Sequence, residues 1–196
     1  MKFEDMHYLR QSLKALADFS DAEWELVVSC LQIKTFEKGE LLLKAGDVCR
    51  SLLFLLSGTI VYYYLNDKGD EITTDFAFDG NWVTDNRSRL NATPSHLNIK
   101  AIEKVKAVSL SQTNLDGLYS RVPQMEHAGR ILLEQAYVRL VQLSLDLQIL
   151  SAEERYLKLC REHPQALQRL PLYHIANYLG IAPKSLSRIR NKKSFA

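Results

Sequence analysis

The sequence predicts an α+β fold: an N-terminal antiparallel β jelly roll with flanking helices, then a long helix, then a C-terminal helix-turn-helix unit. Three observations predict this fold. Residues 33–110 form short apolar or alternating runs broken by glycine, residues after 112 follow helical periodicity, and the end of the chain has the pattern of two crossing helices. We therefore expect three domains, over residues 1–122, 123–150 and 151–196.

The chain is predicted to start with a helix and to continue as strands. Residues 12–31 read as one helix, because Ser20 and Glu23 have capping-box spacing and apolar residues follow at helical intervals. Aromatic and β-branched runs then alternate with turn residues, which is typical of an antiparallel barrel or jelly roll. The turns are expected at residues 38–39, 45–47, 57–58, 66–69 and 79–80.

A long helix with two apolar stripes is predicted from about residue 124 to residue 150. At ~1.5 Å per residue it would be roughly 39 Å long. Because two apolar faces need two partners, we expect one face to pack on the β domain and the other to form a homodimer. The alternative is a helix buried wholly within its own subunit. The stripe with heptad spacing, the predicted dimer interface, contains Leu133, Ala136, Leu140, Leu143, Leu147 and Leu150.

Bulk properties exclude several classes of protein. The 196 residues are 46% hydrophobic and 24% charged, with a net charge of +2, which is ordinary for a globular protein. The first residues include Glu4 and Asp5 and lack the apolar run of a secretory signal. The three cysteines, Cys30, Cys49 and Cys160, form no CxxC pair and predict free thiols in a reducing cytosol. We expect a cytoplasmic protein that has no membrane partner.

The C-terminal stretch LPLYHIANYLGIAPKSLSRIR fits a helix-turn-helix position by position. Ala176 is small where the two helices would cross, and Gly180 can supply the positive φ of a tight turn. Pro183 suits the first turn of the second helix, where a missing N–H costs nothing. Apolar residues recur on the inward faces of both helices: Ile175, Leu179, Ile181, Leu186 and Ile189.

The outward face of the second predicted helix is polar and basic. From Leu172 to Ala196 the chain contains no Asp or Glu. Short polar and basic side chains on such a helix suit the major groove, so we expect double-stranded DNA as a partner. A solvated basic tail is the alternative that charge alone leaves open. The predicted DNA-binding residues are Pro183, Lys184, Ser185, Ser187, Arg188, Arg190, Lys192 and Lys193.

These motifs resemble the catabolite-activator/fumarate-nitrate-regulator (Crp–Fnr) family over essentially the whole chain. The C-terminal ones resemble the subgroup that is common in Bacteroidetes. The resemblance implies a cyclic-nucleotide-binding-like sensor domain, a parallel homodimer through the long helix, and a transcription regulator that reads an inverted-repeat operator. It also implies RNA polymerase as a partner. The segments that carry the resemblance are 36–40, 45–47, 55–58 and 66–69 in the β domain, and 151–156, 175–181 and 186–190 beyond it.

The sequence departs from the relatives that bind cyclic AMP. Those relatives carry a Gly-Glu pair and then Arg-Ser/Thr-Ala, whose arginine pairs with the cyclic phosphate. Residues 78–97 contain neither element, so we expect that the effector is not cyclic AMP. No cofactor is required, and an unknown small-molecule effector is left open. An altered pocket, or else a surface loop, would contain Trp82, Asp85, Arg87, Arg89 and His96.

The sequence contains no signature of a metal site or of an enzyme. Three scattered cysteines cannot supply four thiolates to an iron–sulfur cluster, and the five histidines lack metal-ligand spacing. No nucleophile–base pair or phosphate loop is evident, so no catalytic residue is proposed. Two rival functions remain: a regulator that works without a ligand, and a protein-interaction adaptor that keeps the fold. The acid-free basic segment argues against the adaptor.

Overall fold

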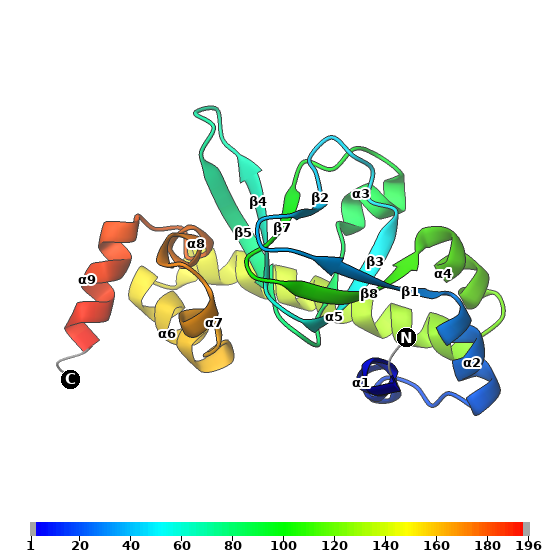
Figure 1. Ribbon diagram of the computed structural model, residues 1–196. Coiled ribbons are helices and arrows are strands. Elements are labelled where there is room, and N and C mark those ends of the chain that lie inside the picture. The colour runs from blue at the N-terminus through cyan, green and yellow to red at the C-terminus, as the bar shows by residue number, and fades with distance from the viewer. Residues whose placement is uncertain (1–2, 194–196) are drawn as a thin grey trace.

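The computed structural model describes the backbone of residues 3–193 and the side chains of residues 5–191. Within that range the strands form two four-stranded antiparallel sheets, in the orders β1-β8-β3-β6 and β2-β7-β4-β5. The predicted α+β fold is confirmed, with helices at both ends of the strands (Figure 1). The strands are β1 (Leu31–Phe36), β2 (Leu41–Leu43), β3 (Ser51–Ser57), β4 (Ile60–Leu65), β5 (Glu71–Ala77), β6 (Trp82–Val83), β7 (Asn98–Ala101) and β8 (Val105–Ser111).

Strand β3 is covered on both faces, which explains its continuous apolar run. Leu53 and Leu55 point between the two sheets, where they pack with Ile60 and Ile99. Phe54 points to the other side, into the cluster formed with the N-terminal helices. A strand that is buried on one face only would alternate apolar and polar residues instead.

Two turns of the sandwich come very close together at Gly58. The residue has φ +106, and a Cβ placed there would lie 2.7 Å from the carbonyl oxygen of Lys104. A side chain is therefore excluded by both conformation and space. This contact fixes the β3–β4 turn against the β7–β8 turn.

The N-terminal region contains two helices, so the prediction of one helix over residues 12–31 is wrong. Helix α1 covers Phe3–Lys14 and α2 covers Asp21–Ser29. Ser20 is the N-cap of α2, and its side chain accepts a hydrogen bond from the Glu23 amide in a capping box. The predicted continuous helix includes the capping box at Ser20 and Glu23, but an N-cap residue lies at the start of a helix and not in its interior. The capping box therefore marks the start of α2. Leu9, Leu13 and Val27 are buried together against the sandwich.

The long helix that follows the sandwich agrees with its predicted range, and a shorter helix precedes it. Helix α4 covers Gln112–Tyr119, and the long helix α5 covers Pro123–Ile149. Met125 and Ala128, at the start of α5, are buried in the cluster that α1 and α2 also enter. A short helix that we did not predict, α3 (Asn86–Asn91), lies between β6 and β7.

The C-terminal unit (residues 151–193) begins at a capping box. The Ser151 side chain accepts from the amide of Glu154, and the Glu154 carboxylate accepts from the amide of Ser151. The unit contains α6 (Ala152–Glu162), α7 (Ala166–Arg169), α8 (Leu172–Tyr178) and α9 (Pro183–Lys193). Its core continues into the β domain, since Val61 and Phe76 are buried in the same cluster as Leu159 and Ile175.

Candidate nucleic-acid interface

Helices α8 and α9 cross as the sequence predicts. Ile175, Ala176 and Leu186 are fully buried at the crossing. Gly180, with φ +66, ends α8: its amide donates to the carbonyl of Asn177, and the amide of the next residue donates to the carbonyl of Ala176. This pair of bonds is a Schellman ending, which a left-handed glycine makes possible. The turn therefore sets the angle between α8 and α9.

The face of α9 that points away from α8 is exposed and basic. Lys184, Ser187 and Arg188 are exposed, and we call these three residues the recognition face. The Ser187 hydroxyl donates to the carbonyl of Pro183 at 3.1 Å. In Figure 1, α9 lies at the end of the molecule, with α8 between it and the strands.

The other predicted DNA-binding residues differ in their surroundings. Pro183 is exposed as the first residue of α9, and Ser185 is half-buried. Arg190 is exposed and lies close to Tyr156, where burial raises the pKa of the tyrosine hydroxyl and the arginine opposes that effect. The side chains of Lys192 and Lys193 lie outside the described residues.

An arginine in α6 joins the end of α5 to the end of α8. Arg155 donates from Nη1 to the carbonyl of Leu150 at 2.6 Å, and from Nη2 to the carbonyl of Leu179 at 2.9 Å. Both carbonyls are at helix ends, where they lack partners in the helix itself. The bond to Leu179 thus supports the residue just before the tight turn.

Helix α8 is held against β5 by buried polar contacts. The Thr73 hydroxyl and His174 Nδ1 are hydrogen-bonded at 2.6 Å, and both side chains are almost fully buried. Nearby, Asn177 Nδ2 donates to the carbonyl of Glu71 at 2.9 Å. Burial, with Lys100 acting in the same direction, lowers the pKa of His174 to about 4. The imidazole is therefore neutral at pH 7.

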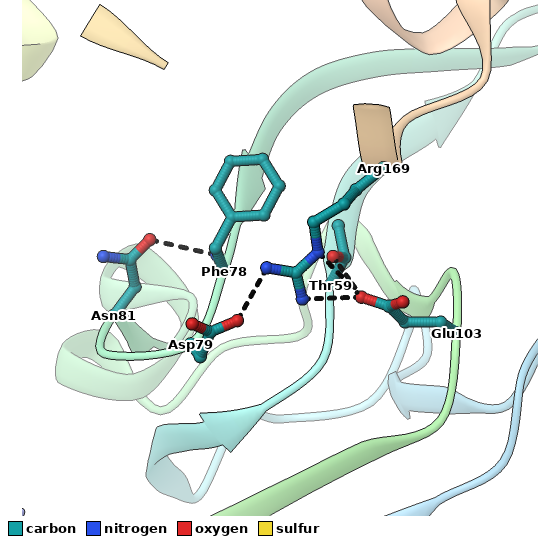
Figure 2. A network of polar contacts seen from close by, with 6 residues as sticks. All are labelled: Thr59, Phe78, Asp79, Asn81, Glu103 and Arg169. Carbon is teal, nitrogen blue, oxygen red and sulfur yellow. Dashed lines mark hydrogen bonds and ion pairs between the residues drawn. The ribbon is translucent and has the colours of Figure 1, made fainter. Parts of the chain in front are cut away.

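Arg169, the last residue of α7, reaches two turns of the β domain (Figure 2). Its guanidinium donates to the carboxylates of Asp79 and Glu103, each at 2.6 Å. Thr59, which is fully buried, also donates to Glu103. Burial acts to raise the pKa of Glu103, but the hydrogen bonds from Thr59 and Arg169 outweigh it, so the pKa is lower than usual. The carboxylate is ionised at neutral pH.

A second ion pair joins α5 to the sandwich. Arg139 in α5 donates to the Asp75 carboxylate in β5. Burial raises the pKa of Asp75, and Arg139 acts against that rise. Arg139 also lines a cavity of about 600 Å³ that lies between α5 and the C-terminal unit. Other side chains in that cavity include Val138, Leu143, Lys158, His163 and Tyr178.

The five predicted pocket residues have separate surroundings around α3. Asp85 is the N-cap of α3: it accepts from the Ser88 amide and from the Ser95 hydroxyl. Arg89 donates to Gln112 and to Asn86. Arg87 and His96 are exposed. The Trp82 ring packs on the ring of Phe54, with 5.2 Å between the two ring centres. That they form an effector pocket stays a prediction.

The predicted dimer stripe is largely uncovered in the single chain. Leu140 is 64% exposed, and Leu133 and Leu147 are each 47% exposed. Ala136 is also exposed, whereas Leu143 and Leu150 are half-buried. Large apolar groups repeated along one helix rarely stay in water in a folded protein. Apolar side chains off this stripe are exposed as well, Val138 at 66% and Ile149 at 71%, so that the heptad stripe is the dimer interface stays a prediction.

The described residues show no arrangement that would hold a metal ion or cross a membrane. No group of three or more His, Cys, Asp or Glu side chains among them is placed to bind a metal. Within the same residues, the helices lack the combined length and apolar character that a membrane span needs.

Comparison of the sequence with known proteins identifies the β domain. The family model of the cyclic nucleotide-binding domain matches residues 33–122. The fumarate and nitrate reduction regulatory protein of Shigella dysenteriae is 29% identical over 167 residues, covering 80% of this chain and 66% of that protein. The chain thus spans slightly less than two thirds of the length of that relative, which is named as a regulatory protein and not as an enzyme.

Solved structures share the fold across most of the chain. FixK2 from Bradyrhizobium japonicum has a TM-score of 0.71 at 15% identity and covers 83% of both chains. The c-di-GMP-responsive global regulator CLP of Xanthomonas campestris has a TM-score of 0.70 at 15% identity, covering 89% of this chain and 92% of its own. Residues 33–122 are therefore a domain of the cyclic nucleotide-binding type. Over most of the chain, the fold is shared with these two solved structures.

Proposed function

We propose that this protein is a homodimeric transcription regulator that binds an inverted-repeat operator in double-stranded DNA. The observation that carries the proposal is the recognition face: α9 presents basic and short polar side chains to solvent, on a helix whose angle is set by a buried crossing. A twofold dimer presents two such helices, so the half-site centres should lie about one helical turn, ~34 Å, apart. The exposed stripe on α5 supports the dimer.

Arg188→Ala is expected to remove operator recognition and to leave the fold intact. The exposed guanidinium can pair with guanine O6 and N7, an interaction worth ~1–3 kcal/mol of discrimination between bases. Genomic footprinting with the tagged wild type supplies the operator, and fluorescence anisotropy then compares the variants. Lys38→Ala, which removes an exposed cation in the β1–β2 turn, is the control and should bind normally. Equal affinity and sequence preference in Arg188→Ala would refute the assignment.

The effector of this protein is proposed not to be cyclic AMP. A cyclic phosphate in the jelly roll would need a paired cation, since an unpaired buried charge is strongly disfavoured. Arg89 is already bonded to Gln112 and Asn86, while Arg87 is exposed. Because neither arginine of α3 is available inside the jelly roll to pair with a phosphate, the structure also favours the alternative of a regulator that needs no ligand.

Titration calorimetry with cyclic AMP at physiological concentration should therefore give a flat trace. DNA binding should likewise be independent of the nucleotide. The opposite finding, a saturable micromolar isotherm that is lost in Arg87→Ala or Arg89→Ala, would show that one of these side chains swings in to replace the missing arginine of the cassette.

Further parts of the proposal rest on the family resemblance. They are the Bacteroidetes-type subgroup suggested by residues 151–156, 175–181 and 186–190, and RNA polymerase as a partner. The proposed cytoplasmic location rests instead on the three cysteines, which form no CxxC pair. Co-purification of the tagged protein with RNA polymerase from its own host tests the polymerase as a partner.

A further inference from the structure

The C-terminal unit is attached to the β domain by an apolar contact, by the hydrogen bonds of His174 and Asn177 to β5, and by Arg169 at the edge of the contact. Phe76 in β5 and Phe78 just after it lie in the same buried cluster as Ile175 and Leu179. Apolar burial is favourable but has no preferred direction. Arg169 makes directional contacts at the edge of this cluster, so it can select one orientation among those that burial allows.

The guanidinium of Arg169 bridges two turns that are far apart in the sequence. Nη1 donates to Asp79 and Nη2 to Glu103, and Nε lies 3.1 Å from the same Glu103 oxygen. The central carbon of the guanidinium is 5.2 Å from the centre of the Phe78 ring. The planar fork of a guanidinium donates to the two carboxylates in fixed directions, whereas the ammonium of lysine is a compact point charge without that fork, so lysine is not an equivalent residue here.

The β domain holds the acceptors of this network in place by itself. Figure 2 shows Thr59 and Arg169 both donating to the Glu103 carboxylate, at the same oxygen, Oε1. The Asn81 side chain accepts from the amide of Phe78, which fixes the turn that carries Asp79. The two turns that carry Thr59 and Glu103 are those packed together at Gly58. The arginine therefore binds a preformed site.

We propose that Arg169 is a positioning residue for DNA recognition: it fixes the orientation of α9 relative to the turns at Asp79 and Glu103. The inference rests on the proposed DNA-binding function. The recognition face is solvent-exposed while Arg169 is bound to the β domain, so the network leaves α9 free to meet DNA. An inverted repeat needs two recognition helices at one separation, and a unit that rotates freely must lose that freedom on binding. A single half-site makes no such demand.

The test compares Arg169→Ala with the wild type on two duplexes, one with a single half-site and one with the full inverted repeat. We expect about tenfold weaker binding to the inverted repeat and an unchanged half-site affinity, because a coupling of this kind is worth roughly 5- to 150-fold. Hydrogen exchange in residues 163–180 should become faster without DNA. Arg169→Lys should recover only part of the loss, since it keeps the charge without the fork.

Two matched variants make the result specific. Lys104→Ala removes an exposed cation that pairs with Glu37 at the same end of the sandwich, and it should behave as wild type. Glu103→Ala should weaken inverted-repeat binding, and combining it with Arg169→Ala should cost less than the sum of the two single changes, as expected for partners.

Three outcomes would overturn the inference. The first is equal loss on both duplexes, which would mean a general structural defect or a direct DNA contact. The second is unchanged inverted-repeat affinity in Arg169→Ala. The third is unchanged hydrogen exchange in Arg169→Ala. Because this measurement needs no DNA, it tests the role of Arg169 in holding the C-terminal unit even if the wild type binds no DNA and the proposed function itself fails.

Discussion

Replacing Leu133 and Leu140 by glutamate is expected to convert a dimer into a folded monomer. Both side chains lie on the heptad stripe of α5 and are 47% and 64% exposed in the single chain. Burying each leucine in an interface contributes ~1.5–3 kcal/mol, and an unpaired carboxylate in its place is strongly unfavourable. In a parallel dimer the two substitutions act from both helices, so the effect is doubled. We expect several kcal/mol of dimer stability to be lost.

The choice of these two leucines follows from the structure. Leu143, another member of the stripe, is half-buried and lines the cavity between α5 and the C-terminal unit, so a charge there would disturb the single chain as well. Leu133 and Leu140 lie outside that cavity, and their replacement reports on the interface alone.

Light scattering gives the mass of each variant in solution. Gln148→Glu places the same charge on α5 outside the heptad stripe and should stay dimeric. Circular dichroism should show an unchanged helix content in the double variant. A monomeric wild type would refute the proposed dimer directly, and a dimeric double variant would show that another surface joins the chains.

The features that sequence predicted well are those with local signals. The glycine at position 180 and the proline at position 183 each act through neighbours within a few residues, so one short segment of sequence is enough to predict the turn and the start of the second helix. The strand runs were similarly recognisable by their composition and their turns. The first helix was mispredicted because apolar spacing continued across Ser20, although the cap itself indicated a start.

The contacts that join α5 and the C-terminal unit to the β domain had no such signal. Arg169 and Glu103 are 66 positions apart, and Arg139 and Asp75 are 64 apart. Each is an ordinary charged residue in the sequence, and only the fold brings the pairs together. The region around α3 shows a different difficulty, because one residue type can have two roles. An aspartate such as Asp85 looks the same in sequence whether it caps a helix or binds a ligand.

His174 is expected to make the protein acid-sensitive between about pH 6.5 and pH 4. Its side chain is fully buried between α8 and β5, with Nδ1 bonded to Thr73. Among the described residues Nε2 is buried without a hydrogen-bond partner. A protonated ring would carry an N–H there that has no acceptor, in addition to a buried charge. Burial and Lys100 accordingly lower the pKa to about 4, from 6.5.

The sign and size of the effect follow from proton linkage. The unfolded chain binds the proton near pH 6.5 and the folded chain only near pH 4, so the contribution is fully present above 6.5 and is lost as the pH falls through that window. A shift of this size corresponds to about 3 kcal/mol of unfolding free energy. His163, whose pKa burial also lowers, adds in the same direction.

Urea unfolding at pH 7, 5.5 and 4.5 tests this expectation. His174→Gln keeps a polar group facing Thr73 but does not titrate, so its unfolding free energy should fall much less steeply with pH than that of the wild type. The exposed His96→Gln should keep the wild-type slope. If His174→Gln and the wild type lose stability in parallel, the buried imidazole is not the acid-sensitive contact between α8 and the sheet. The loss would then have to come from other groups, of which His163, with its lowered pKa, is the first to test.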